Sequence, residues 1–443
     1  MAARGRFLDG PTMGHVIRMT MTGAAGITFV FLVDLVNLFW ISQLGDPKLV
    51  AAIGYAFAVQ FFSVSTGIGL MIAATVMVSK RIGMGQRERA RREATSSMMI
   101  TVAFQSLVAA LIVWFRHDLL ALVGAEGETA ALAARYLLWT VPSLAIMAVG
   151  LVGSAVLRAE GDGKRAMFVT LTSGSVSFVL DPLLIFYWEL GLDGAAIVLV
   201  ISRIILAGNA LRFATVTHDL MAWPRWRTIK RVFLPYFAIA LPAILTQIST
   251  PFGNYLLTGV IASFGDDAVG AWAVVNRLTV VAFGGIFSLS GAIGGIYGQN
   301  FGAKQYDRLR STFRDSLIFC ACYTMVAWFL LSVSAGFMID VFGLKGEGAA
   351  VYRAFAYVGS GAFVLVGALF VSNATFNSLG KPTRSTLANW TRDGILMLPA
   401  AWVGAAWLAA PGVVYAQAVA GGVVGVLAAL WSWHFLKGFG SKA

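Results

Sequence analysis

The sequence has few charged residues, cysteines and histidines for its length. Charged side chains make up 12% of the 443 residues, about half of the roughly 25% typical of a soluble globular domain. Two cysteines and four histidines are too few for a disulfide framework or a Cys/His metal cluster. These deficits, with a mean hydropathy of +0.78, exclude a soluble enzyme, a disordered chain and a nucleic-acid-binding protein. They indicate a polytopic membrane protein.

Long stretches that contain at most one charge predict twelve transmembrane helices. A helix needs about 20 mainly apolar residues to cross a bilayer. The last stretch is too long for one helix and is interrupted by Pro411 and Gly412, so we expect two helices there. In chain order the stretches lie at residues 19–44, 49–79, 94–115, 136–157, 166–188, 194–211, 232–265, 268–303, 316–339, 354–380 and, as a pair, 394–436.

Basic residues are unevenly distributed between the segments that join these stretches. One alternate set of segments holds 24 of the 33 Lys and Arg residues, from Arg4 to Lys442, and the other set holds four. Lys and Arg favour cytoplasmic loops, so we expect both termini in the cytoplasm and a multi-pass protein of the inner or plasma membrane. The net charge of +12 is then an orientation signal rather than a ligand site.

The two halves of the chain repeat a residue pattern. Between 83–91 and 302–310, a Gly, a Gln, an acid and two Arg coincide at an offset of 219. At the same offset Ala155, Gly161 and Arg165 coincide with Ala374, Gly380 and Arg384, and Gly45-Asp46 matches Gly265-Asp266 at 220. Because each half has six helices, the halves share one orientation about an axis along the membrane normal. We therefore predict an all-α membrane protein of two pseudo-symmetric six-helix bundles, residues 1–218 and 233–443, the architecture of an alternating-access transporter. The cytoplasmic connecting loop, 219–232, is either an interfacial helix or a solvated loop.

Five segments distributed along nearly the whole chain form a family pattern. The first is Phe31-Leu32-Val33-Asp34 with Gln43-Leu44-Gly45, in which a single carboxylate lies in the opening helix. The others are Leu157-Arg158-Ala159-Glu160-Gly161-Asp162-Gly163-Lys164, Asp181-Pro182-Leu183-Leu184-Ile185-Phe186, Gly298-Gln299-Asn300-Phe301-Gly302-Ala303 and Leu379-Gly380-Lys381-Pro382. In this order the five segments resemble the multidrug and toxic compound extrusion (MATE) family.

This resemblance implies two six-helix bundles in a V around a central cavity. It also implies export of organic, often cationic compounds in exchange for protons or sodium ions. Carboxylates on the first and fifth helices, here Asp34 and Asp181, resemble the DinF-like branch of the family. The NorM-like branch has acids on the seventh and tenth helices instead, and here those helices have none. The sequence departs from the DinF-like branch at Ser177, because Asn is common there, four residues before the fifth-helix Asp.

Asp34 is the first candidate for coupling transport to an ion. A carboxylate at mid-membrane costs roughly 2.5–3.5 kcal/mol on insertion scales, so an intramembrane acid is functional by default. Burial disfavours the charged form of a carboxyl group, which suits a group that alternately binds and releases a proton. Asn37 lies on the same helical face, where its amide is placed to hydrogen-bond the protonated acid. The alternative is a structural Asp34 that hydrogen-bonds a neighbouring helix.

Asp181 is the second candidate, and two roles stay open for it. Ser173, Ser177 and Asp181 recur every four residues and predict a polar stripe that faces the bundle interior. Asp181 lies ten residues before Gly191 and Arg203 lies twelve after it, so a turn there places both at similar depth. An Arg partner favours the ionised carboxylate and would remove Asp181 from proton exchange. If Arg203 faces the cavity instead, the site is less favourable to cations.

Other polar residues within the predicted helices are candidates for the substrate cavity, with ordinary packing as the alternative for each. Arg277 is the intramembrane charge of the second half, and it either forms an ion pair within its bundle or contacts an anion. No spacing of ligating side chains predicts a metal site. The cavity candidates are Tyr136, Arg203, Gln247, Asn254 and Arg277.

Three other functions compete with drug export. A flippase for a lipid-linked or anionic substrate shares the MATE-type fold, and Arg203 and Arg277 keep it open. The major facilitator superfamily is disfavoured because residues 83–92 lack an Asp-Arg pair before a glycine. A membrane-embedded enzyme needs clustered His, Cys or acids, and the four histidines have no HxxxH or HExxH spacing. We expect a monomeric transporter of a small organic, cationic or amphipathic substrate, with a proton or sodium ion as coupling ion and no cofactor.

Overall fold

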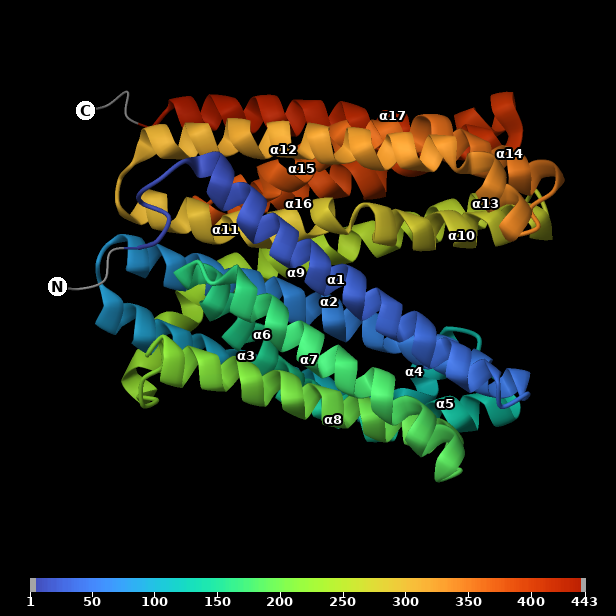
Figure 1. The fold of residues 1–443 in the computed structure, drawn as a ribbon, viewed down its shortest axis with the longest axis horizontal. Helices are drawn as coiled ribbons and strands as arrows, with labels where there is room; N and C mark the ends of the chain where they lie inside the picture. Colours follow the sequence, from blue (N-terminus) through green and yellow to red (C-terminus); the bar gives the residue numbers. More distant parts are fainter. Residues whose placement is uncertain (1–4, 440–443) are drawn as a thin grey trace. The chain divides into compact units, whose positions relative to one another are not determined.

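The computed structural model describes residues 5–439, and helices account for nearly all of this part of the chain (Figure 1). No strand occurs among the described residues. Helices suit long apolar segments because each satisfies its own backbone hydrogen bonds without water. Arg4 and Lys442, two of the basic residues counted for orientation, lie outside the described residues.

The described chain forms two compact units. Unit 1 consists mainly of Ala25–Ile244, and unit 2 consists of Arg6–Ala24 and the described residues from Leu245 onward. These units differ at their edges from the predicted bundles, 1–218 and 233–443. The reason is that α1 (Thr12–Ser42) and α9 (Trp226–Ala262) are continuous helices, and each contributes its two ends to different units.

Unit 1 contains six membrane-spanning segments, counting its share of α1. Helices α6, α7 and α8 pack against one another (Figure 1). Two of the spans end in a π-helical turn, η2 and η3. The elements are α2 (Pro47–Gly83), α3 (Arg87–Trp114), α4 (Arg116–Leu122), α5 (Gly127–Thr140), η1 (Val141–Ser143), α6 (Leu144–Glu160), α7 (Gly163–Pro182), η2 (Leu183–Tyr187), α8 (Gly191–Arg212) and η3 (Phe213–Thr217).

Unit 2 continues from the second part of α9. Its helices α15 and α17 pack against each other over much of their length, and α10 and α11 form a span that is bent by 44°. The elements are α10 (Asp266–Ala282), α11 (Gly284–Gly302), α12 (Tyr306–Val333), α13 (Ala335–Val341), α14 (Gly346–Ala354), η4 (Phe355–Gly359), α15 (Ser360–Ser378), α16 (Pro382–Trp390), η5 (Thr391–Leu396) and α17 (Met397–Lys437).

The last long helical segment is in fact two antiparallel spans. Its backbone leaves the helical conformation at Leu408 and Ala409, where Ala409 has φ 55°. A Cβ atom on Gly404 would lie 2.3 Å from the carbonyl oxygen of Gly412, so the residues on either side of the break lie against each other. Ten segments are long and apolar enough to cross a membrane, and the bent α10–α11 pair is an eleventh. With the two arms of Pro382–Lys437 counted separately, the described chain has the twelve spans that were predicted.

One predicted boundary is wrong. The eleventh span does not begin near residue 394, because helical structure in this segment begins at Pro382. Arg392 and Asp393 therefore lie inside the span rather than in the loop before it.

Repeated Gly-Asp pairs mark the starts of helices. Gly161 has φ 91° and follows α6, and the Asp162 side chain accepts a hydrogen bond of 3.1 Å from the backbone N–H of Arg165 in the first turn of α7. Gly45, with φ 75°, precedes Asp46, which caps α2 in the same way through Lys48. Glycine accepts the positive φ and aspartate satisfies a free helical N–H, so these two helix starts of unit 1 have a local structural cause.

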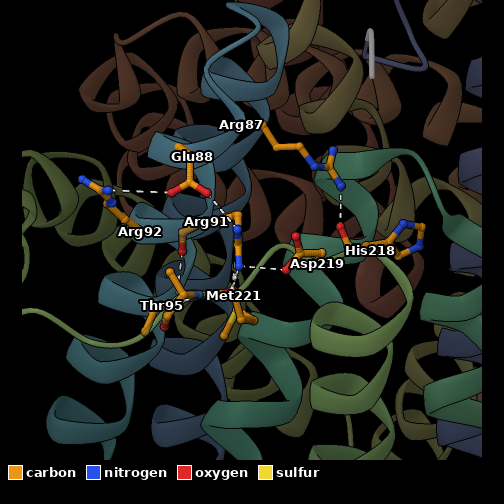
Figure 2. Close-up of polar contacts among 9 residues, drawn as sticks. Arg87, Glu88, Arg91, Arg92, Thr95, His218, Asp219 and Met221 are labelled. Atoms are coloured by element: carbon orange, nitrogen blue, oxygen red, sulfur yellow. Dashed lines mark hydrogen bonds and ion pairs between the residues drawn. The ribbon is translucent and has the colours of Figure 1, made fainter. Parts of the chain in front are cut away.

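The segment that connects the predicted bundles is held against α3 (Figure 2). Arg87 and Arg91 donate to the carbonyl oxygens of His218 and Met221 respectively. Thr95 exchanges two hydrogen bonds of 2.9 Å with the backbone of Ala222. The segment is thus a loop rather than an interfacial helix up to residue 225: it is held against α3 up to Ala222 and exposed at residues 223–225, and α9 begins at Trp226.

A buried group of charges lies beside this segment. Asp162 accepts a hydrogen bond from Nε2 of His218 at 2.9 Å and forms an ion pair with Arg165. Burial raises the pKa of Asp162, but the hydrogen bonds from the backbone and guanidinium of Arg165 and from His218 outweigh burial, and the pKa is lowered overall.

Candidate functional site

Five of the predicted site residues lie in one polar cluster of unit 1. The side chains come from four helices: Asp34 and Asn37 from α1, Tyr136 from α5, Asp181 from α7 and Arg203 from α8. Asp34 and Arg203 are close enough for their charges to interact, and Tyr136 interacts with Arg203 and both carboxylates. The spans therefore bring together residues that are 169 positions apart at the extremes.

Asp34 is the accessible carboxylate of the cluster. Its side chain is exposed, whereas Asn37, one helical turn further along α1, is partly buried. Asn37 was predicted to hydrogen-bond Asp34, but the structure places it beside the carboxyl group of Asp181. An accessible carboxylate in a membrane-spanning helix can exchange a proton or bind a cation.

Asp181 is the buried carboxylate. It is 0% exposed, and neither carboxyl oxygen reaches hydrogen-bond geometry with any described residue. The predicted stripe is buried, but its two serines do not contact Asp181. Ser173 donates to the carbonyl oxygen of Ser202 at 2.9 Å, and Ser177 hydrogen-bonds the Ser202 hydroxyl. A buried carboxylate without a positive charge in contact with it is costly, so this position is suited to a bound proton or cation.

Arg203 is buried, with 7% of its surface exposed, and its hydrogen bonds all go to neutral acceptors. Nη1 donates to the Thr140 carbonyl and to Ser143 Oγ, both at 2.7 Å, and Nη2 donates to Gln60 Oε1 at 3.2 Å. Within the described part of the chain, no carboxylate lies within 4 Å of the guanidinium. The ion pair with Asp181, one of two predicted alternatives, is therefore not formed.

A 3₁₀ turn explains why the Thr140 carbonyl is available. In the short segment η1, the backbone N–H of Leu144 bonds to Val141 rather than to Thr140. The freed carbonyl accepts from Arg203 and from Ser143. The sequence analysis did not predict this arrangement, because it considered only charged partners for Arg203 and not the neutral acceptors Thr140, Ser143 and Gln60.

The three remaining cavity candidates belong to unit 2. Gln247 and Asn254 are partly buried residues of α9, and Arg277 is an exposed residue of α10. The described residues provide no hydrogen bond or ion pair to the Arg277 side chain, and none joins these three side chains to one another. The predicted ion pair of Arg277 within its bundle is therefore not present.

Unit 2 contains an ion pair that the sequence reasoning did not find. Arg392 Nε lies 2.7 Å from Asp393 Oδ1, and Arg392 Nη2 lies 2.8 Å from Oδ2. The two residues are 5% and 2% exposed. Ser249 and Thr250 of α9 add hydrogen bonds to Asp393 Oδ2, at 3.0 and 3.4 Å. Each oxygen of this carboxylate is thus satisfied, in contrast to Asp181.

Comparison with known proteins finds relatives along most of the chain. The family model MatE matches residues 24–183 and 242–403. A FAD transporter of Shewanella oneidensis is 24% identical over 410 residues, which cover 91% of this chain and 90% of that protein. The multidrug export protein MepA of Staphylococcus aureus is 24% identical over 280 residues, which cover 61% of each. Among solved structures, the MATE transporter VcmN of Vibrio cholerae in the bent form has a TM-score of 0.90 at 24% identity and covers 96% of this chain and 97% of its own.

Proposed function

The chain belongs to the MatE family, and on that basis we propose that it exports small organic compounds across the cell membrane by alternating access, in exchange for protons. Both termini lie in the cytoplasm, and the protein acts as a monomer. The polar cluster of unit 1 is the coupling site. Asp34 takes up and releases the proton, and Asp181, Asn37 and Tyr136 complete its surroundings.

The observation that carries this proposal is the state of the two carboxylates in unit 1. Asp34 is exposed within a membrane-spanning helix, and the fully buried Asp181 has no hydrogen-bond partner among the described residues. A structural aspartate in such a place is normally paired or hydrogen-bonded. Two carboxylates without an ion pair among the described residues, with the Asn37 amide beside Asp181, are instead suited to ligands that come and go, and protons are the simplest such ligands.

Reconstitution into liposomes tests the proposal. Efflux of a fluorescent organic dye is followed under an imposed pH gradient and, separately, under a sodium gradient. We expect proton-driven efflux by the wild type and none by Asp34→Asn. Efflux driven only by sodium would assign sodium as the coupling ion, and efflux by Asp34→Asn at the wild-type rate would overturn the role of Asp34.

The behaviour of Asp181→Asn separates its two possible roles. If Asp181 exchanges a proton, this variant loses coupling as Asp34→Asn does. If Asp181 only supports Asn37 and α1, dye efflux persists with an altered rate and an unchanged dependence on the pH gradient.

A second candidate substrate class is anionic. Arg277 is exposed within a membrane-spanning segment and has no partner in the described chain, and one relative is a FAD transporter. A lipid-linked or anionic compound would supply the missing counter-charge. Transport of an anionic dye that is lost in Arg277→Gln, with no transport of cationic dyes, would favour this candidate.

A further inference from the structure

Arg203 differs from Arg392, which is also buried within a span, because no carboxylate of the described residues lies within ion-pair distance of it; Asp34 faces it from further away. Arg392 contacts Asp393 at 2.7 Å, whereas the three acceptors of Arg203 are a carbonyl, a hydroxyl and an amide oxygen. Neutral acceptors satisfy the N–H groups but do not cancel the charge. The positive charge of Arg203 therefore acts on its surroundings in unit 1.

This charge is fixed in both position and sign. Residues of α2, α5 and η1 hold the guanidinium from different sides, and Gln60 is itself held by its hydrogen bond of 2.8 Å to Thr140 Oγ1. Arginine does not deprotonate in proteins under ordinary conditions. The titratable groups that face Arg203 are Asp34 of α1 and Tyr136 of α5, and Asp181 of α7 faces Asp34. These groups change charge with pH, and Arg203 does not.

We propose that Arg203 is a specificity-determining residue whose unneutralised charge disfavours lipophilic cations and favours neutral, zwitterionic or anionic amphipathic substrates. This inference rests on the proposed function and narrows its substrate class. Arg203 does not contact the substrate, because it is buried. It acts through its electrostatic field, which a membrane-embedded site of low dielectric constant screens only weakly.

Two probes of the same size and shape but opposite charge test the inference directly. Equilibrium binding of tetraphenylphosphonium and of tetraphenylborate is measured on the protein in nanodiscs, with empty nanodiscs subtracted. In Arg203→Gln we expect the cation to bind about tenfold more tightly and the anion about tenfold more weakly. This is the size expected for unit charges about 10 Å apart at an effective dielectric constant of about 20.

Three further variants separate charge from structure. Arg203→Lys keeps the charge and should keep the wild-type ratio of the two affinities. Gln60→Glu places a carboxylate at the position that now accepts from Nη2, neutralises the guanidinium in place, and should reproduce Arg203→Gln even if that variant does not fold. Arg135→Gln removes an exposed arginine of the same unit that is already paired with Asp193 and should leave the ratio unchanged.

Each measurement is made at one pH and repeated in the Asp34→Asn background, which removes the titrating carboxylate that faces Arg203. Opposite changes for the two probes support the inference. Changes in the same direction, no change in either probe, or binding of neither probe to the wild type would overturn it. Failure of the proposed function has a different signature, because the wild type would then bind the probes but move no substrate under an imposed gradient.

Discussion

Unit 1 and unit 2 each bury an arginine and an aspartate in membrane-spanning segments, but only in unit 2 do the two side chains meet. Arg392 and Asp393 form two contacts below 3 Å, and hydroxyl groups of α9 satisfy the carboxylate further. In unit 1, Arg203 bonds to neutral groups, and Asp181 has no ion pair among the described residues, with the Asn37 amide beside it. The internal repeat is thus preserved in the order of the helices, and not in the charges they bury.

The two units also differ at positions that correspond in the internal repeat. At the offset of 219 that relates the halves, Gly174 of α7 corresponds to Asp393. A Cβ atom on Gly174 would lie 2.7 Å from Phe29 of α1, and a Cβ atom on Gly253 of α9 would lie 2.9 Å from Cβ of Asp393. The fifth helix of each half therefore packs closely on the first helix of that half, with a glycine in unit 1 and an ion pair in unit 2.

This difference separates a structural use of charge from a functional one. A paired and hydrogen-bonded aspartate loses several interactions when it is protonated, so it resists proton exchange. An aspartate without an ion pair, such as Asp181 beside the neutral Asn37 amide, loses less. We infer that unit 2 uses its buried charges to join α9 to the eleventh span, and that unit 1 keeps its charges available for transport.

Removal of the carboxylate that we assign to proton exchange in unit 1 should have the greatest effect on transport. Asp34→Asn should reduce proton-driven efflux to the level of protein-free liposomes, because the amide cannot exchange a proton. Its thermal unfolding should stay close to that of the wild type, because Asp34 is exposed and has no ion pair within 4 Å in the described chain. A large fall in stability together with the loss of efflux would instead assign Asp34 a structural role.

Removal of the paired carboxylate of unit 2 should affect stability rather than transport. Asp393→Asn should lower the free energy of unfolding by about 3–5 kcal/mol, because it leaves the Arg392 charge buried without its partner. Thermal unfolding in detergent measures the loss, and hydrogen–deuterium exchange should localise it to unit 2.

The control replaces both partners together. Arg392→Met combined with Asp393→Leu should regain most of that stability, since an apolar pair of similar volume is often neutral or stabilising. The double variant should also keep the pH dependence of efflux. A changed pH dependence would contradict a purely structural ion pair.

A smaller effect compares one serine in each unit. Ser249→Ala removes a hydrogen bond to the charged Asp393 and should cost about 2 kcal/mol, whereas Ser177→Ala removes a hydrogen bond between two neutral hydroxyls and should cost about 1 kcal/mol. Chemical unfolding of the two variants side by side gives the difference. Equal costs would indicate that the Asp393 carboxylate does not depend on α9.

Features with a local cause were predictable from the sequence. Charge-free stretches predicted the twelve spans, because membrane insertion depends on the hydropathy of each segment. Pro411 and Gly412 predicted the reversal, which occurs two residues earlier at Ala409.

Features that depend on distant partners were not predictable. A count of charges placed the start of the eleventh span after Asp393, because nothing nearby shows that Arg392 neutralises it and that Ser249, 144 positions earlier, completes the site. The expected Arg203–Asp181 pair failed because a backbone carbonyl of α5 takes the guanidinium instead. Every residue has a carbonyl, so the sequence gives no sign of which one is free.

Unit 1 also contains paired charges, but these lie at helix ends rather than inside the spans, and removal of one of them should have the smallest effect. Asp162→Asn should cost about 1 kcal/mol at pH 7, the usual size of a helix cap, because the amide accepts the hydrogen bond of Arg165 less strongly. The folded-state pKa of Asp162 lies below its ordinary value. The stability it contributes is therefore fully present above the unfolded pKa of about 3.9, and it is lost as pH falls through the folded-state pKa. Thermal unfolding at pH 7, 5 and 3 should show the difference between wild type and variant shrinking at the lowest pH, and a difference that is independent of pH would show that the charge of Asp162 contributes nothing.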